Sequence, residues 1–172
     1  MRTGVLLPDS LATGSSRDLV AWARTAEDVG FDSVGVRGWI VRDSLEPLIA
    51  LSLLAASTQR VELLLHVPTV RRAQPLILTR QLSCLERASR RRLTVAAGGA
   101  LDDTWVCAGR GGRRRCIPVV DVCGMEGAEL DAVSDVLDQF ERSGADDVLL
   151  DPPSSDLLDL ERLANLGALA LV

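Results

Sequence analysis

The 172-residue sequence contains no tyrosine and no lysine, so all 19 of its basic residues are arginines. Aromatic residues make up 3% of the chain, whereas hydrophobic residues make up 47%, which predicts a core of aliphatic side chains. We interpret the exclusive use of arginine as a nucleotide-composition bias of the source genome. The net charge of −5 argues against general binding to nucleic acids.

Long apolar runs and targeting signals are also lacking. No apolar run approaches the ~18 residues of a membrane span, and no basic segment followed by an apolar one stands at the N-terminus. The four cysteines show neither CxxC nor zinc-type spacing; they are Cys84, Cys107, Cys116 and Cys123. We therefore expect a cytoplasmic protein with free thiols, no membrane contact and no metal site.

The segment from Val61 to Gly99 has the pattern of a strand, a helix and a second strand. Its first part, Val61–Val67, is apolar except for Glu62 and His66, as expected of a strand buried on both faces of a parallel sheet. Pro75 suits a first helical position, and the leucines that follow recur at helical spacing. A second apolar run then ends in Gly98-Gly99, which predicts one βαβ unit.

The same alternation of strand and helix extends over most of the chain. Other strands are predicted at Gly4–Pro8, Asp32–Val36, Ile117–Val122 and Asp146–Leu150, and other helices at 15–29, 43–57, 128–142 and 157–166. The stretch from Ala100 to Arg115 has no clean period. Six strands are too few for an eight-stranded β/α barrel, which typically needs ~250 residues. We expect an α/β fold, either an open sheet or a barrel from which units are missing.

Four segments, taken in order, resemble the bacterial luciferase-like superfamily of flavin- and deazaflavin-dependent enzymes, which are β/α barrels. They are WARTAEDVGFDSVGV, EPLIALSLLAASTQRVELLL, PLILTRQLSCLERASRRRLTVAAGG and FERSGADDVLLDPPSSDLLDLERLA. The resemblance covers about two thirds of the chain. It implies a single luciferase-like domain over residues 1–172, an incomplete barrel of about six parallel strands, with the middle strands missing around 100–116.

The sequence departs from the pattern of this family at three places. Many relatives have an acidic residue and a histidine after the second strand, where Gly38 and Trp39 stand here. A strained non-prolyl cis bond often follows the third strand, at the positions of Leu65, His66 and Val67. The alternating glycines of the fourth strand are replaced by Ala-Ala-Gly-Gly at 96–99.

Candidate site residues follow the predicted strands, because the carboxyl ends of parallel strands carry the chemistry in α/β folds. His66, whose ordinary pKa is near neutrality, and Asp121 are the candidate catalytic residues. Trp39 could stack on a planar ring, and Gly98-Gly99 could let a ligand approach the backbone. The resemblance adds Val67 to this cofactor-binding set. Asp9, Arg37 and Asp151 also end or follow strands, so all of these residues could lie around one opening at the carboxyl ends of the strands.

Each candidate also has a purely structural interpretation. His66 could be a hydrogen-bonded polar residue at a strand end, and the aspartates could cap loops. Trp39 could be a rim residue, and the glycine pair a plain turn. The arginine runs at 90–92 and 113–115 could bind a phosphate, but we expect them to be solvated.

Three functions remain open at this stage. The first is a luciferase-like oxidoreductase or monooxygenase that acts on a small organic molecule with reduced FMN or a deazaflavin coenzyme. The second is a catalytically silent relative that binds a ligand or a protein partner, its cofactor site lost. The third is a cofactor-independent enzyme that uses His66 and an aspartate. An unclosed barrel would leave two unpaired strand edges, and the tail from Leu169 to Val172 is apolar, so we also expect a homodimer.

Overall fold

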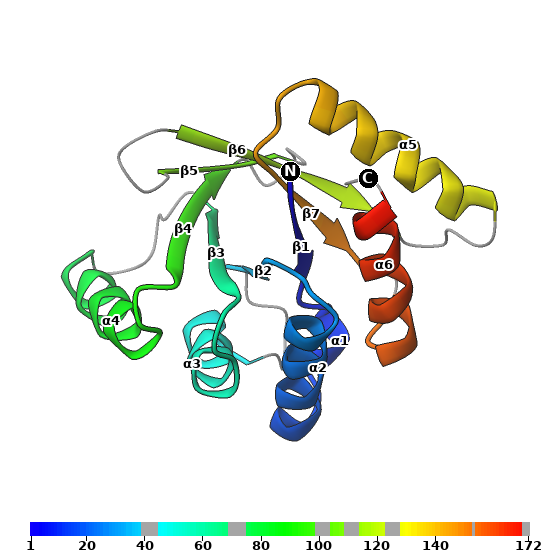
Figure 1. Cartoon of the computed structure of the whole chain (residues 1–172). Coiled ribbons are helices and arrows are strands. Elements are labelled where there is room, and N and C mark those ends of the chain that lie inside the picture. Colours follow the sequence, from blue (N-terminus) through cyan, green and yellow to red (C-terminus); the bar gives the residue numbers. More distant parts are fainter. Residues whose placement is uncertain are drawn as a thin grey trace.

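The computed structural model describes residues 1–38, 45–68, 75–98, 104–108, 114–122, 128–152 and 154–169. In this part of the chain, seven strands form one closed barrel in chain order (Figure 1). The strands are β1 (Arg2–Leu6), β2 (Ser33–Arg37), β3 (Glu62–Pro68), β4 (Leu93–Gly98), β5 (Thr104–Ala108), β6 (Arg114–Asp121) and β7 (Asp147–Asp151). The helices are α1 (Asp9–Ala12), α2 (Ser16–Asp28), α3 (Pro47–Ser57), α4 (Pro75–Ala88), α5 (Ala128–Arg142) and α6 (Leu157–Leu169).

Local signals in the sequence set where the helices begin and end. The Ser15 hydroxyl accepts a hydrogen bond from the backbone N–H of Arg17 at 3.1 Å and so caps α2. Pro47 opens α3, and the carboxylate of Glu46 accepts from two backbone N–H groups of its first turn. Gly30 and Gly144 follow α2 and α5 with φ of 104° and 83°, a conformation that glycine adopts without strain. The ends of α2 and the C-terminal end of α5 agree with the predictions from sequence, whereas α3 begins at Pro47, four residues later than predicted.

The predicted sheet needs two corrections. Strands β1, β2, β3, β4, β6 and β7 run parallel where they pair, but a seventh strand, β5, lies antiparallel between β4 and β6. The barrel is therefore closed, not incomplete. Antiparallel strands can be joined by a few residues, whereas a parallel pair needs a crossover of a dozen or more. The short chain between Gly98 and Arg114 can reverse direction twice, but it cannot hold a β/α unit.

Because the barrel is closed, it has no open strand edges, and the homodimer can no longer be predicted from such edges. Each of the seven described strands is hydrogen-bonded to two neighbours, so none leaves a free edge. The apolar tail belonged to the same argument, and residues 170–172 lie outside the described part of the chain. The homodimer stays a prediction.

Alternation along the strands separates two apolar clusters. The larger one lies between the barrel and its helices; among its fully buried members are Val5, Val34, Leu63, Val148, Trp22 and Leu54. The smaller one fills the barrel and consists of Leu6, Leu64, Ala96, Cys107, Ile117 and Leu149, with Val119 packed against it. The interior is tightly packed at Gly4, because a Cβ there would lie 2.1 Å from the hydroxyl oxygen of Ser33 on the neighbouring strand and 2.7 Å from the side chain of Leu149. Because alternate residues face the same side, Glu62 and His66 face the interior with Leu64.

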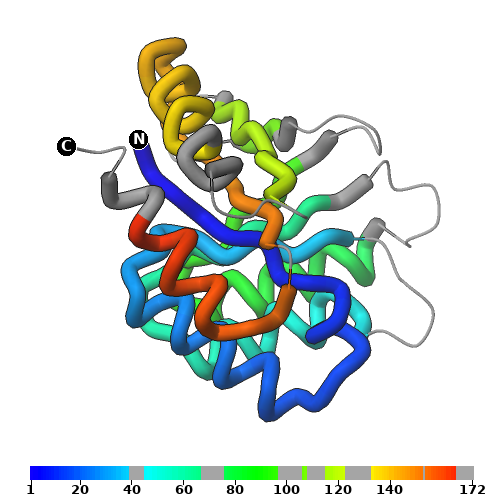
Figure 2. Tube along the Cα trace, turned by 90° about the vertical axis from the view of Figure 1, so that its right-hand side faces the viewer, coloured from blue at the N-terminus to red at the C-terminus, as the bar shows by residue number. Residues whose placement is uncertain are grey.

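One flank of the barrel has no helix among the described residues. Helices α2, α3 and α4 follow one another around the lower half of the barrel, whereas no labelled helix lies between α4 and α5 (Figure 1). Figure 2 gives the view turned by 90°. Strand β5 lies in this interval, and Val95 on β4 is 39% exposed there. The described helices therefore leave the outer surface of the barrel near β4 and β5 uncovered.

Candidate functional site

The carboxyl ends of the parallel strands meet at one end of the barrel, which we call the mouth. Register pairs Arg37 of β2 with His66 of β3, and Asp121 of β6 with Asp151 of β7. All four stand at interior positions of the strand alternation, in the layer above the apolar interior cluster. Active sites of β/α barrels lie at this end. The mouth is therefore the candidate functional site.

His66 is the deepest polar residue of the mouth. Its side chain is 1% exposed, and it lies one interior position above Leu64 on β3. An imidazole can hold or release a proton near neutral pH, and its two nitrogens can each make a directed hydrogen bond. An imidazole at this place inside the barrel can exchange a proton with a small ligand that enters from the mouth, or form a hydrogen bond to it.

An ion pair between Arg37 and Asp151 crosses the mouth. Strands β2 and β7 both neighbour β1, so the pair extends over the end of β1 at Leu6. The two side chains are 16% and 19% exposed. Burial raises the pKa of Asp151, and the negative charges of the nearby Asp121 and Asp9 raise it further, whereas the positive charge of Arg37 lowers it. The pKa of Asp151 therefore lies above its ordinary value of 3.8.

Replacing Arg37 by methionine should lower the free energy of unfolding at pH 7 by about 2 kcal/mol, because Asp151 would keep its charge in a half-buried place without a cation. A carboxyl whose pKa is raised in the folded state costs stability when ionised, and this cost disappears as the pH falls through that pKa. The deficit should therefore shrink between pH 7 and pH 4 in urea unfolding.

Asp151→Asn in the Arg37→Met background provides the matched control, because the neutral amide needs no cation. It should recover most of the stability lost at pH 7 and remove the added pH dependence. A deficit that stays constant with pH, or one that the asparagine does not repair, would contradict the ion-pair account.

The candidate residues from sequence have the following places. His66 and Asp121 lie at the same end of the barrel, as predicted. Gly98 ends β4 there, in register with Pro68, and the backbone of Val67 pairs with Ala97. Trp39 and Gly99 lie outside the described residues. All peptide bonds of the described residues are trans, so the cis bond of some relatives is not found there.

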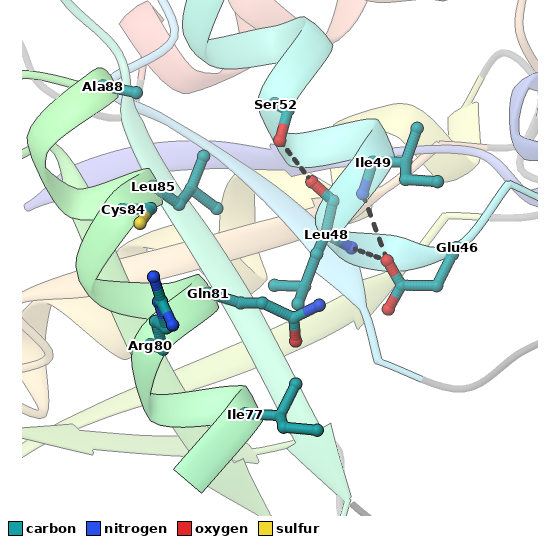
Figure 3. Close-up of a pocket in the computed structure, with 10 residues that line it drawn as sticks. All are labelled: Glu46, Leu48, Ile49, Ser52, Ile77, Arg80, Gln81, Cys84, Leu85 and Ala88. Atoms are coloured by element: carbon teal, nitrogen blue, oxygen red, sulfur yellow. Dashed lines mark hydrogen bonds between the residues drawn. The ribbon is translucent and has the colours of Figure 1, made fainter.

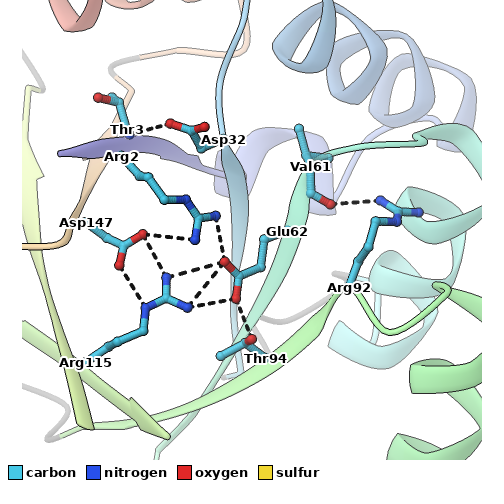
Figure 4. Close-up of polar contacts among 9 residues, drawn as sticks. All are labelled: Arg2, Thr3, Asp32, Val61, Glu62, Arg92, Thr94, Arg115 and Asp147. Carbon is cyan, nitrogen blue, oxygen red and sulfur yellow. Dashed lines mark hydrogen bonds and ion pairs between the residues drawn. The ribbon is translucent and has the colours of Figure 1, made fainter. Parts of the chain in front are cut away.

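The opposite end of the barrel, which we call the floor, is closed by a polar cluster that sequence reasoning missed (Figure 4). Arg115 binds Asp147 through two nitrogens at 2.7 and 2.8 Å and Glu62 at 3.0 Å. Arg2 donates to Glu62 at 2.7 Å, and the Thr94 hydroxyl donates to the same carboxylate. The side chains of Arg115, Glu62 and Asp147 are 13%, 14% and 4% exposed.

The arginine runs are therefore not simply solvated. Arg115 belongs to the floor, and Arg92 donates to the backbone carbonyls of Ala55, Thr58 and Val61 behind α3. Because all of these interactions join parts of the chain to one another, we assign the floor a structural role, as is usual for that end of a β/α barrel.

The described residues do not point to chemistry by a reactive thiol or by a bound metal ion. Burial raises the pKa of the Cys107 thiol inside the barrel, which disfavours the reactive thiolate. The described cysteines, Cys84, Cys107 and Cys116, are free. Within the described ranges, no group of three His, Cys, Asp or Glu side chains could hold a metal ion.

The fold and the mouth define an α/β-barrel protein with a polar site at the carboxyl ends of its strands. The chain belongs to the luciferase-like monooxygenase family, whose model matches residues 1–109, more than half of the 172 residues. No curated protein matches the chain.

Solved structures to which the chain is similar include three whose names state an activity. The coenzyme F420-dependent tetrahydromethanopterin reductase from Methanopyrus kandleri is 20% identical, with a TM-score of 0.48, over 56% of this chain and 26% of that one. Long-chain alkane monooxygenase is 13% identical, with a TM-score of 0.48, over 58% and 30%. Monooxygenase RslO1 from Streptomyces bottropensis is 20% identical, with a TM-score of 0.49, over 98% and 67%. The chain thus spans about a quarter to a third of the length of the first two.

Proposed function

We propose that this protein is a flavin- or deazaflavin-dependent oxidoreductase, of the monooxygenase type, that acts on a small organic molecule at the mouth of the barrel. The observation that carries the proposal is a fully buried histidine at the mouth of a luciferase-like barrel. His66 is the proposed acid or base, and Asp121 is the second candidate catalytic residue. Trp39, Val67, Gly98 and Gly99 are the proposed contacts of the cofactor.

We infer that described residues of the mouth could contact the ring of such a cofactor. The ring nitrogens of His66 and the guanidinium of Arg37 stand on adjacent strands, in register, where they could donate to the carbonyl oxygens of a flavin. Below them the interior is apolar, with Leu6, Leu64 and Ala96. A reduced flavin or deazaflavin supplies the electrons when bound, while the chain orients the substrate and His66 holds or moves the proton.

The described mouth is less suited to a phosphate group. Three carboxylates lie at or beside it, those of Asp9, Asp121 and Asp151, while its one arginine, Arg37, is already paired with Asp151. A phosphate placed there would meet more negative than positive charge. We infer that the ring contributes most of the affinity and the phosphate tail little.

FMN should therefore bind only weakly, with a Kd above about 1 μM, and riboflavin should bind with an affinity within about threefold of that of FMN. Charged hydrogen bonds to a cradled phosphate would contribute about 1.5–3 kcal/mol, which is more than tenfold in affinity. Quenching of flavin fluorescence measures both constants. Tight, stoichiometric FMN binding, or a preference of more than tenfold over riboflavin, would show that a phosphate site exists.

Turnover tests the function itself. The FMN-loaded protein, reduced without oxygen, is mixed with oxygen and a panel of small organic molecules, and the products are identified by mass spectrometry. The same series is run with reduced deazaflavin coenzyme without oxygen. An oxidised product in the FMN series with oxygen, or a reduced product in the deazaflavin series, above the level formed by the free cofactor supports the proposal; equal product with and without the protein contradicts it.

A catalytically silent relative is the second candidate. The ion pair across the mouth and the acidic surroundings favour it, because both work against an anionic cofactor. Such a protein would bind a neutral or cationic small molecule in the same place, and it would bind riboflavin without oxidising any member of the panel.

We further infer a single luciferase-like domain over residues 1–172, in which the antiparallel β5 stands in place of the middle barrel units. The free thiols of Cys84, Cys107 and Cys116 fit a reducing compartment such as the cytoplasm. None of the helices in the described part of the chain is long and apolar enough to span a membrane.

A further inference from the structure

A pocket of about 490 Å³ lies at the floor of the barrel, and we call it the floor pocket. This volume is in the range of sites for small ligands. The floor pocket is lined by four arginines and three acidic residues, namely Arg2, Arg60, Arg92, Arg115, Glu62, Asp146 and Asp147. The lining therefore carries one net positive charge, in a chain whose net charge is −5.

A larger pocket between α3 and α4, of about 870 Å³, has a different lining (Figure 3). Apolar side chains such as Leu48 and Ile77 line it, together with a single arginine, Arg80. Its one carboxylate, that of Glu46, already accepts from two backbone N–H groups at the start of α3. The concentration of arginine therefore distinguishes the floor pocket from this larger one.

The two buried carboxylates of the floor pocket have their cationic partners within the chain (Figure 4). Glu62 accepts hydrogen bonds from Arg2, Arg115 and the hydroxyl of Thr94. Asp147 is held by two nitrogens of Arg115 at 2.7 and 2.8 Å. A ligand that enters the pocket would therefore meet acceptors that are already engaged.

The arginines differ in how many of their donors are engaged. A guanidinium group has five N–H donors, and Arg92 donates five hydrogen bonds, all to oxygen atoms of this chain. The exposed side chain of Arg60 donates one hydrogen bond within the described residues, to the carbonyl of Glu27 at 3.1 Å. Arg2 is 43% exposed and contacts Glu62 and Asp147. Donors of Arg2 and Arg60 thus remain for a ligand.

Arg60 also lines a smaller pocket, which contains other carboxylates. Glu27 there accepts from the backbone N–H groups of residues 59, 60 and 61, and Asp32 accepts from the N–H of Thr3. Neither carboxylate depends on the guanidinium of Arg60 for its hydrogen bonds. The Arg60 side chain can therefore turn its donors to the floor pocket.

We propose that the floor pocket binds a small oxyanion, a phosphate or carboxylate group, between the guanidinium groups of Arg2 and Arg60. The planar guanidinium offers pairs of donors that match two oxygens of such a group. Arg92 and Arg115 add positive charge while their donors stay with the chain. The site lies at the end of the barrel opposite the mouth, so it does not depend on the function proposed there.

Isothermal titration calorimetry with inorganic phosphate, and separately with malonate, tests the proposal. At least one of the two should bind at one site per chain with a Kd below about 1 mM, because two charged hydrogen bonds suffice for this affinity. At ten times the Kd, the ligand should raise the melting temperature by about 3–5 °C. The tighter ligand identifies the group as phosphate or carboxylate. A Kd above about 1 mM for both, or a shift that sodium chloride of equal ionic strength reproduces, overturns the proposal.

Variants of single arginines locate the site. Arg60→Gln and Arg2→Gln should each weaken binding at least about tenfold, the usual effect of losing one charged hydrogen bond. Arg90→Gln is the matched control, because Arg90 is exposed and donates to Gln59 at 3.3 Å but does not line the pocket. It should weaken binding less than about threefold. Circular dichroism identifies any variant that fails to fold, and the folded one of Arg60→Gln and Arg2→Gln then decides. Equal effects of Arg60→Gln and Arg90→Gln would mean diffuse attraction to positive charge and overturn the proposal.

Asp146→Asn gives a readout that a purely structural floor would not produce. Asp146 is exposed and lines the floor pocket, where its negative charge opposes that of the bound oxyanion. The variant should therefore bind the tighter of the two ligands about threefold more strongly than the wild type. Unchanged or weaker binding would contradict the placement of the anion in this pocket.

Discussion

Replacing Arg115 by alanine is expected to lower the free energy of unfolding by about 3–5 kcal/mol, the usual cost of removing one partner of a buried ion pair. Arg115 is the only described cation that binds Asp147 through two nitrogens, and it also binds Glu62. Without it, Arg2 remains, but its side chain is 43% exposed and lies 3.5 Å from Asp147. Two carboxylates at the floor would then lack most of their positive charge.

The acid limb of stability gives a second readout for the same variant. Burial alone would raise the pKa of Glu62, but hydrogen bonds from Arg115, Thr94 and Arg2 outweigh it, so the pKa lies below its ordinary value of 4.5. A carboxyl with a lowered pKa contributes stability above the unfolded pKa and loses it as the pH falls through the folded one. In Arg115→Ala this contribution from Glu62 should be smaller, so stability should decrease less steeply below about pH 4.5.

Arg142→Ala is the matched control for Arg115→Ala. Arg142 also pairs with an aspartate, Asp138, but the contact is 3.8 Å long and the side chains are 76% and 43% exposed. Surface pairs of this kind contribute about 0–1 kcal/mol. Urea unfolding at pH 7 compares the two variants. Losses of similar size, or a loss below about 1 kcal/mol for Arg115→Ala, would mean that the floor does not hold the barrel together.

Replacing His66 by glutamine is expected to lower kcat about 100-fold or more if the mouth carries the proposed reaction. General acid–base catalysis by a positioned side chain contributes about 10²–10⁴-fold, and glutamine keeps hydrogen-bonding groups of similar size but cannot exchange a proton near neutral pH. The measurement is turnover with the substrate and reduced cofactor that the panel identifies. In the variant, the part of the pH dependence of kcat/KM that His66 controls should disappear.

This result separates catalysis from structure. If His66 only fills the interior, the glutamine variant would change the melting temperature, while kcat per folded molecule and the pH profile would stay as in the wild type. Flavin affinity should fall by less than about tenfold, the usual value of one neutral hydrogen bond. A variant with full turnover would leave Asp121, or a group outside the described residues, as the proton carrier.

Much of the fold follows from local patterns in the sequence. Helix α5 spans Ala128–Arg142 as predicted, and β7 lies within one residue of its predicted bounds. Periodicity of 3.6 or 2, together with glycines and capping residues, acts over a few neighbouring residues, which is why a single sequence reveals it. The gathering of His66, Asp121 and Asp151 at one end was also predictable, because parallel strands place their carboxyl ends together.

Strand β5 is the element that these patterns missed. Its sequence, TWVCA, has residues that favour strands, and glycines, a residue type that favours turns, follow it in the sequence. The periodicity does not reveal this strand, because it is short and lies in a stretch with no clean period. Its direction depends on the length of chain available between β4 and β6, and on the two neighbours that supply its hydrogen bonds.

The floor and the ion pair of the mouth arise from contacts between residues far apart in the chain. Arg2, Glu62, Arg115 and Asp147 come from four strands, and Arg37 and Asp151 are separated by 114 positions. In the sequence, Arg115 is the last of three arginines and looks solvated. Its burial follows from the register of β6 in the closed barrel, which turns Arg115 inward while its neighbour Cys116 remains exposed. Local propensity forms the strands, but register and closure determine which charges meet, because only the assembled barrel brings them within bonding distance.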